Sequence, residues 1–148
     1  MRLNHEESFT IQGGNFLDAG EVSIHIKRML QDMGVAPEIL RRVAIATYES
    51  EINIISYATW GVIHIQVSPE EVVIDVDDEG PGIEDIELAM QVGYSTATDK
   101  IREMGFGAGM GFPNIKHCSD SFEVTSKVNK GTHLKIKFKM QQTDTTES

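Results

Sequence analysis

The chain has 148 residues, of which 40% are hydrophobic and 24% are charged, the composition of an ordinary globular protein. Its 13 basic and 23 acidic side chains argue against nucleic-acid binding, which needs a basic surface, and against docking on anionic membranes. No apolar run of the sequence approaches the ~20 residues that span a bilayer.

The first third of the sequence predicts one strand and two helices. Residues 7–12 are typical of a strand, and Asn15 is expected to cap a helix that ends at Gly34. Apolar side chains recur between these two residues at helical spacing. Pro37 opens a second helix that runs to about Ala58, because proline fits the first turn of a helix.

The rest of the sequence predicts two strand pairs and two short helices. The strands are 61–67, 71–77, 121–128 and 132–140. An acidic helix is expected at 84–90, followed by a loop at 92–109 that is rich in glycine, serine, threonine and charge. A helix over 110–118 comes next, with Pro113 in its first turn.

Alternation of apolar and polar side chains predicts the layers of the fold. In the last strand Leu134, Ile136 and Phe138 alternate with a histidine and lysines, so one face of the sheet is buried and the other is solvated. Helices must then cover the apolar face. We expect an α+β fold, a two-layer α/β sandwich with a mixed, mostly antiparallel sheet and its helices on one face.

We expect a single domain at residues 1–140 and a disordered tail at 141–148. The single cysteine, Cys118, cannot form an intrachain disulfide, and the N-terminus is polar from its start. Both features favour a cytoplasmic protein. A homodimer stays open, because Phe16 and Leu17 are compatible with dimer contacts and with core packing.

A glutamate and an asparagine share one face of the second helix. Glu49 and Asn53 lie four residues apart, while Glu51 points elsewhere. An isolated pair of this kind is typical of an exposed polar face. The functional interpretation is a site with oxygen ligands, in which the amide binds Mg²⁺ and the carboxylate orients or deprotonates a nucleophile.

A carboxylate and two glycines follow the strand 71–77. Asp78 continues the apolar parity of that strand, so its carboxylate needs specific hydrogen-bond donors. Gly80 and Gly82 leave room for a planar ligand to approach the backbone. Thr132 shares the parity of Leu134 and faces the same side of the sheet. Each of these features is also compatible with an ordinary turn or strand.

The segment GFGAGMGF, residues 105–112, carries four glycines at every second position. It is neither a dinucleotide fingerprint nor a P-loop, because no strand precedes it and no Gly-Lys-Ser/Thr ends it. What remains is a row of unhindered amides at the start of a helix, which favours an anion. The alternative is a flexible hinge.

Together these motifs resemble the N, G1, G2 and G3 boxes of the GHKL ATPases, the superfamily of gyrase-type topoisomerases, Hsp90, histidine kinases and mismatch-repair ATPases. The resemblance runs from about Arg41 to Phe138 and implies the Bergerat type of sandwich. The segments DDEGPGIEDIELAMQVGYST and GFGAGMGFPNIKHCSDSFEV are similar to bacterial partner-switching kinases of the anti-sigma-factor and stressosome switch types.

The resemblance implies a role for individual residues. Asn53 would ligate Mg²⁺, and Glu49 would act as general base toward the attacking hydroxyl. Asp78 would accept a hydrogen bond from the adenine amino group, supported by Thr132. The other residues expected to contact ATP or ADP are Gly80, Gly82, Ile83, Lys100, Gly107, Ala108, Gly109, Met110 and Gly111.

The resemblance also implies a function and partners. The chain would be a Mg²⁺-ATP-dependent serine/threonine kinase that phosphorylates a STAS-domain anti-anti-sigma or antagonist protein in a pathway controlling a sigma factor. One alternative is a nucleotide-dependent binding module that sequesters a sigma factor or a phosphatase without turnover. A stand-alone ATPase is the third interpretation.

Overall fold

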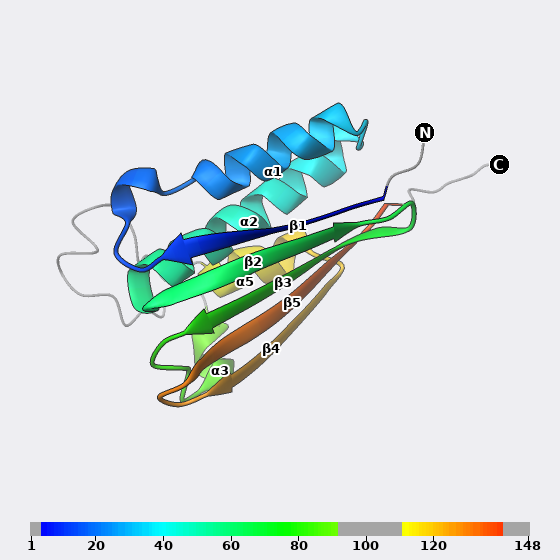
Figure 1. The fold of residues 1–148 in the computed structure, drawn as a ribbon. Coiled ribbons are helices and arrows are strands. Elements are labelled where there is room, and N and C mark those ends of the chain that lie inside the picture. The colour runs from blue at the N-terminus through cyan, green and yellow to red at the C-terminus, as the bar shows by residue number, and fades with distance from the viewer. Residues whose placement is uncertain (1–3, 92–110, 141–148) are drawn as a thin grey trace.

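The computed structural model describes residues 4–91 and 111–140 of the chain. Its five strands are β1 (His5–Gln12), β2 (Trp60–Val67), β3 (Glu71–Glu79), β4 (Ser121–Lys127) and β5 (Gly131–Lys139). They form one sheet in the order β1-β2-β3-β5-β4 (Figure 1). Every pairing in this sheet is antiparallel. The mixed sheet expected from the sequence is therefore corrected to an antiparallel one over the described residues.

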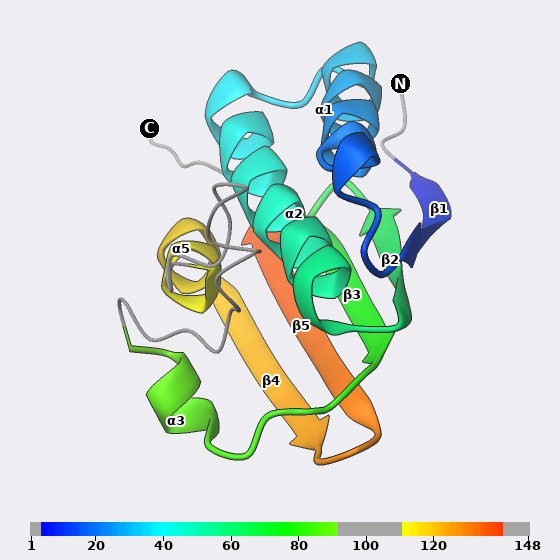
Figure 2. The ribbon, with the colours of Figure 1, turned by 90° about the vertical axis from the view of Figure 1, so that its left-hand side faces the viewer.

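The helices lie on one face of this sheet. They are the 3-10 turn η1 (Phe16–Asp18) and the α-helices α1 (Glu21–Asp32), α2 (Pro37–Tyr57), α3 (Ile86–Ala89) and α5 (Gly111–Cys118). Figure 2 shows α2 across the middle of the sheet, with α1 beside it over β1 and β2 and α5 on its other side. The predicted two-layer α/β sandwich is confirmed.

The core lies between the two layers, where the strand alternation placed it. Ile65, Ile74 and Ile136 come from three neighbouring strands and are all fully buried. They pack with fully buried side chains of the helices, such as Ile26 and Val43. Burial of one such aliphatic side chain contributes about 1.5–3 kcal/mol, so this interface holds the helices against the sheet.

The first helix begins later than the sequence indicated. Asn15 makes no capping hydrogen bond and instead donates from Nδ2 to Asp18 Oδ2 at 2.8 Å. α1 begins only at Glu21, after Gly20. The acceptor for its first amide groups is Glu51 of α2, and a capping group so distant in sequence cannot be recognised from local spacing.

The other element boundaries differ less from expectation. α2 begins at Pro37 as predicted, whereas α3 covers only the middle of the expected helix 84–90. Phe16 packs partly buried against the core, and Leu17 is 98% exposed. Among the described residues, no helix combines the length and the apolar character that crossing a bilayer requires.

Candidate functional site

Glu49 of α2 faces the first turn of α5. Its Oε2 accepts a hydrogen bond from Asn114 Nδ2 at 2.9 Å. A Cβ added to Gly111, the first residue of α5, would lie 3.7 Å from Glu49 Oε1. The carboxylate therefore sits beside the N-terminal end of a helix, where negative charge is favourable. Asn114 belongs to no motif of the sequence and was not predicted.

Asn53 lies one turn further along α2, on the same face as Glu49, and is half-buried. Ala58, five residues later, caps α2 and contacts the loop after β3. A Cβ added to Gly80 in that loop would lie 3.0 Å from the Ala58 Cα. One helix thus joins the surroundings of Glu49 to the surroundings of Asp78.

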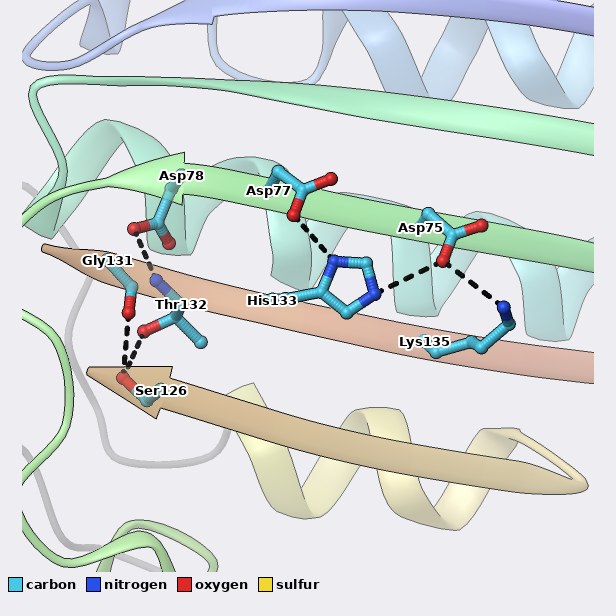
Figure 3. Close-up of polar contacts among 8 residues, drawn as sticks. All are labelled: Asp75, Asp77, Asp78, Ser126, Gly131, Thr132, His133 and Lys135. Atoms are coloured by element: carbon cyan, nitrogen blue, oxygen red, sulfur yellow. Dashed lines mark hydrogen bonds and ion pairs between the residues drawn. The ribbon is translucent and has the colours of Figure 1, made fainter.

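Asp78 stands near the end of β3, directly opposite Thr132 of β5. Its Oδ1 accepts a hydrogen bond from the Thr132 backbone N–H at 3.2 Å (Figure 3). Burial raises the pKa of the Asp78 carboxyl above its ordinary range, and the neighbouring charge of Asp77 acts in the same direction. The Thr132 amide opposes this rise. A half-buried carboxylate with a perturbed pKa in this position is typical of a ligand site.

Both glycines of the loop after β3 are explained by close packing. A Cβ on Gly80 would come within 3.4 Å of Asp78 Oδ1 as well as against Ala58. Gly82 has a φ of +75°, and a Cβ there would overlap the carbonyl oxygen of Lys127 on β4. These contacts bring the loop against the end of α2 and the end of β4. A side chain at either position would displace the loop from Asp78.

Ser126 at the end of β4 ties this loop to the β4–β5 hairpin. Its Oγ accepts from the Ile83 backbone N–H at 2.8 Å and donates to the Gly131 carbonyl at 3.0 Å. It also lies 2.8 Å from Thr132 Oγ1. Sequence reasoning missed this residue, because a serine at a strand end carries no signal of its own.

Several predicted site residues lie outside the described residues. They are Lys100, Gly107, Ala108, Gly109 and Met110. Gly111 is described, at the start of α5 beside Glu49. The expected contacts of the other residues with phosphate therefore stay predictions.

The oxygen donors at this site fit a magnesium nucleotide. The residues described include no group of three His, Cys, Asp or Glu side chains that could hold a metal ion. Mg²⁺ is commonly bound by only one or two protein oxygens, with phosphates and water completing its shell. The amide oxygen of Asn53, one turn from the Glu49 carboxylate, is a donor of that kind.

Comparisons with known proteins bear on the family of this chain. The family model for the histidine kinase-, DNA gyrase B- and HSP90-like ATPase matches residues 38–142. The chain is 36% identical over 99 residues to the anti-sigma F factor of Thermoanaerobacter sp. (strain X514), covering 67% of this chain and 62% of that protein. It is 30% identical over 112 residues to the serine/threonine-protein kinase RsbT of Bacillus subtilis (strain 168), covering 73% and 78%. The first of these matches thus spans less than two thirds of the relative.

Proposed function

Because the chain belongs to the family of histidine kinase-, DNA gyrase B- and HSP90-like ATPases, we propose that it is a Mg²⁺-ATP-dependent protein serine/threonine kinase. Its acceptor would be a STAS-domain anti-anti-sigma or antagonist protein. Support comes from one relative named a serine/threonine-protein kinase and another named an anti-sigma factor. Phosphorylation of the acceptor would place about −2 charge at the contact surface and release the partner.

The observation that carries the proposal is that α2 contacts both regions of the site, the start of α5 and the loop after β3. Its Glu49 faces the start of α5, and its C-terminal end contacts the loop beside Asp78. Asp78 would bind the adenine amino group, so the phosphates of the same nucleotide would extend toward α5. Phosphoryl transfer depends mainly on such positioning and on charge neutralisation.

Each polar residue of the site then has a distinct task. Asn53 would hold Mg²⁺, which when bound neutralises charge on the phosphates. Glu49 would take the proton of the attacking hydroxyl. Asn114 holds Glu49 Oε2 and so orients Oε1, the oxygen on the side of Gly111, for that proton.

The test is transfer of radiolabel from ATP to a candidate STAS protein, with Glu49→Ala compared against the wild type. We expect transfer to fall by about 10²–10⁴-fold, which is the usual contribution of a general base. Glu38→Ala, an exposed glutamate in the first turn of the same helix, is the matched control and should keep full activity. Undiminished transfer by Glu49→Ala would contradict the assigned role.

The names of the anti-sigma F relatives favour a second candidate, a binding module that holds a sigma factor without turnover. The two functions separate in one experiment. Glu49→Ala should keep nucleotide and partner binding under both proposals, and only under the kinase proposal does it lower a measured activity, by about 10²–10⁴-fold. Phosphate release without any protein acceptor would instead favour a stand-alone ATPase. The cytoplasmic location expected from the sequence stays a prediction.

A further inference from the structure

Ser126 has three hydrogen-bond partners, two in strand β5 and one in the loop after β3. Figure 3 shows dashed lines from its Oγ to Gly131 and to Thr132, the first two residues of β5. The distances are 3.0 Å to the Gly131 carbonyl oxygen and 2.8 Å to Thr132 Oγ1. The third partner, the Ile83 backbone N–H, lies 2.8 Å away in the loop after β3.

The direction of each of these hydrogen bonds follows from counting protons. A serine hydroxyl has one proton and two lone pairs. The Ile83 N–H can only donate and the Gly131 carbonyl can only accept, so the Ser126 proton goes to Gly131. The Ser126–Thr132 contact fits either oxygen as donor, and the arrangement that satisfies all three partners of Ser126 has the Thr132 hydroxyl donating to its remaining lone pair. Thr132 is therefore a donor to Ser126.

This direction decides what Thr132 presents to a ligand. Its only hydroxyl proton is used by Ser126, so its oxygen offers lone pairs alone in every other direction. The neighbouring Asp78 carboxylate, held by the Thr132 amide, is also an acceptor. Two adjacent side chains on β3 and β5 thus both accept hydrogen bonds.

We propose that Ser126 is a specificity-determining positioning residue, which holds the Thr132 hydroxyl as an acceptor so that the Asp78–Thr132 pair selects a purine with an amino group over one with an oxo group at the same position. The inference rests on the proposed nucleotide binding and adds the residue that sets the polarity of the base pocket. An oxo group would face two acceptors and lose its hydrogen bonds, which reduces binding by about a hundredfold or more.

The test compares the dissociation constants of Mg²⁺-ADP and Mg²⁺-IDP by titration calorimetry. The two probes differ at the purine amino position, which is an oxo group in IDP, and at the adjacent N1, which carries a proton only in IDP. We expect the wild type to prefer ADP by about a hundredfold or more. In Ser126→Ala the Thr132 proton is free to turn toward the ligand, so this preference should fall about tenfold. Ser121→Ala, at the other end of β4, is the matched control and should keep the wild-type ratio.

A purely structural role for Ser126 would give a different result. Loss of the Ile83 contact alone would weaken ADP and IDP equally and leave their ratio unchanged, which would overturn the inference. Ser126→Thr restores a hydroxyl and should recover the ratio. In a Thr132→Val background, Ser126→Ala should have no further effect on the ratio, because the hydroxyl on which it acts is missing.

The variants also separate the possible failures. If Ser126→Ala does not fold, the comparison of Thr132→Ser with Thr132→Val carries the test. The serine variant should keep the preference for ADP and the valine variant should lose most of it, whereas equal ratios in the two would overturn the inference. Wild-type protein that binds ADP and IDP equally would overturn the inference alone. Wild-type protein that binds neither nucleotide would overturn the proposed function and the inference with it.

Discussion

At the scale of single residues, the site combines carboxylates in two different environments. Glu49 lies beside the start of α5 and is oriented by Asn114. Asp78 lies between two strands, and burial raises the pKa of its carboxyl. An ionised carboxylate that is half-buried lowers the free energy of unfolding. Groups of this kind are typical of positions that bind a ligand.

This cost predicts how Asp78→Asn behaves as a function of pH. The pKa of Asp78 in the folded protein lies above its ordinary value of 3.8, so its contribution to stability is fully present below pH 3.8 and is lost as the pH rises through the folded value. Asparagine does not titrate and still accepts the Thr132 N–H. The variant should therefore gain stability relative to the wild type across this window and stay more stable at neutral pH.

Urea denaturation over a series of pH values measures this difference in the free energy of unfolding. Asp32→Asn, at the exposed end of α1, is the control and should track the wild type. The same Asp78→Asn protein should bind ADP at least tenfold more weakly, because its amide is a donor toward the adenine amino group. A variant that is less stable than the wild type at neutral pH would contradict this account of Asp78.

At the scale of elements, α1 is anchored by a side chain of α2. The buried Glu51 carboxylate accepts from the backbone N–H groups of Gly20 at 3.0 Å, Val22 at 3.2 Å and Ser23 at 3.2 Å. The side chain is only 2% exposed. Burial raises the pKa of the carboxyl, while the three amides act against that rise. The cap thus joins α1 to α2, the helix that carries Glu49 and Asn53.

Removal of this anchor should destabilise the fold. In Glu51→Ala three amides lose their acceptor, two of them on buried residues, and we expect a loss of about 2–3 kcal/mol in the free energy of unfolding. Urea denaturation at pH 7 measures it. Glu38→Ala on the same helix should change stability by no more than about 0.5 kcal/mol. Equal urea midpoints for Glu51→Ala and Glu38→Ala would contradict this expectation. They would show that water replaces the Glu51 carboxylate as the acceptor of these amides.

At the scale of the whole molecule, α2 connects two regions that lie far apart in the sequence. Its middle contacts α5 through Glu49, and its end contacts the loop at Gly80. A nucleotide that binds at Asp78 and extends its phosphates toward α5 would hold both regions together. Strand β1, at the opposite edge of the sheet from β4, would be unaffected (Figure 1).

Hydrogen exchange with and without Mg²⁺-ADP tests this arrangement. We expect slower amide exchange in the loop 80–83 and in the first turn of α5, 111–114, because both become ordered around one ligand. Exchange in β1 should stay the same and serves as the internal control. Protection of only one of the two segments would show that the nucleotide does not span them.

The sequence by itself determined the layers of the fold and the order of the site motifs. Strand alternation in residues 132–140 and the spacing of Glu49 and Asn53 are local patterns, and local backbone geometry decides which face each side chain takes. Asp78 and Thr132 followed in the same way from strand parity. The family resemblance rested on these motifs, and the match to residues 38–142 bears it out.

Only the tertiary structure decided which groups meet. Glu51 caps a helix 31 residues away at Gly20, Asn114 contacts Glu49 across 65 residues, and Ser126 accepts from Ile83 across 43. None of these partners repeats with a helical or strand period, so no local pattern indicates them. Whether these hydrogen bonds form depends on how α2, α5 and the β4–β5 hairpin pack against one another. A hydrogen bond requires a donor–acceptor distance within a few tenths of an ångström of about 2.9 Å.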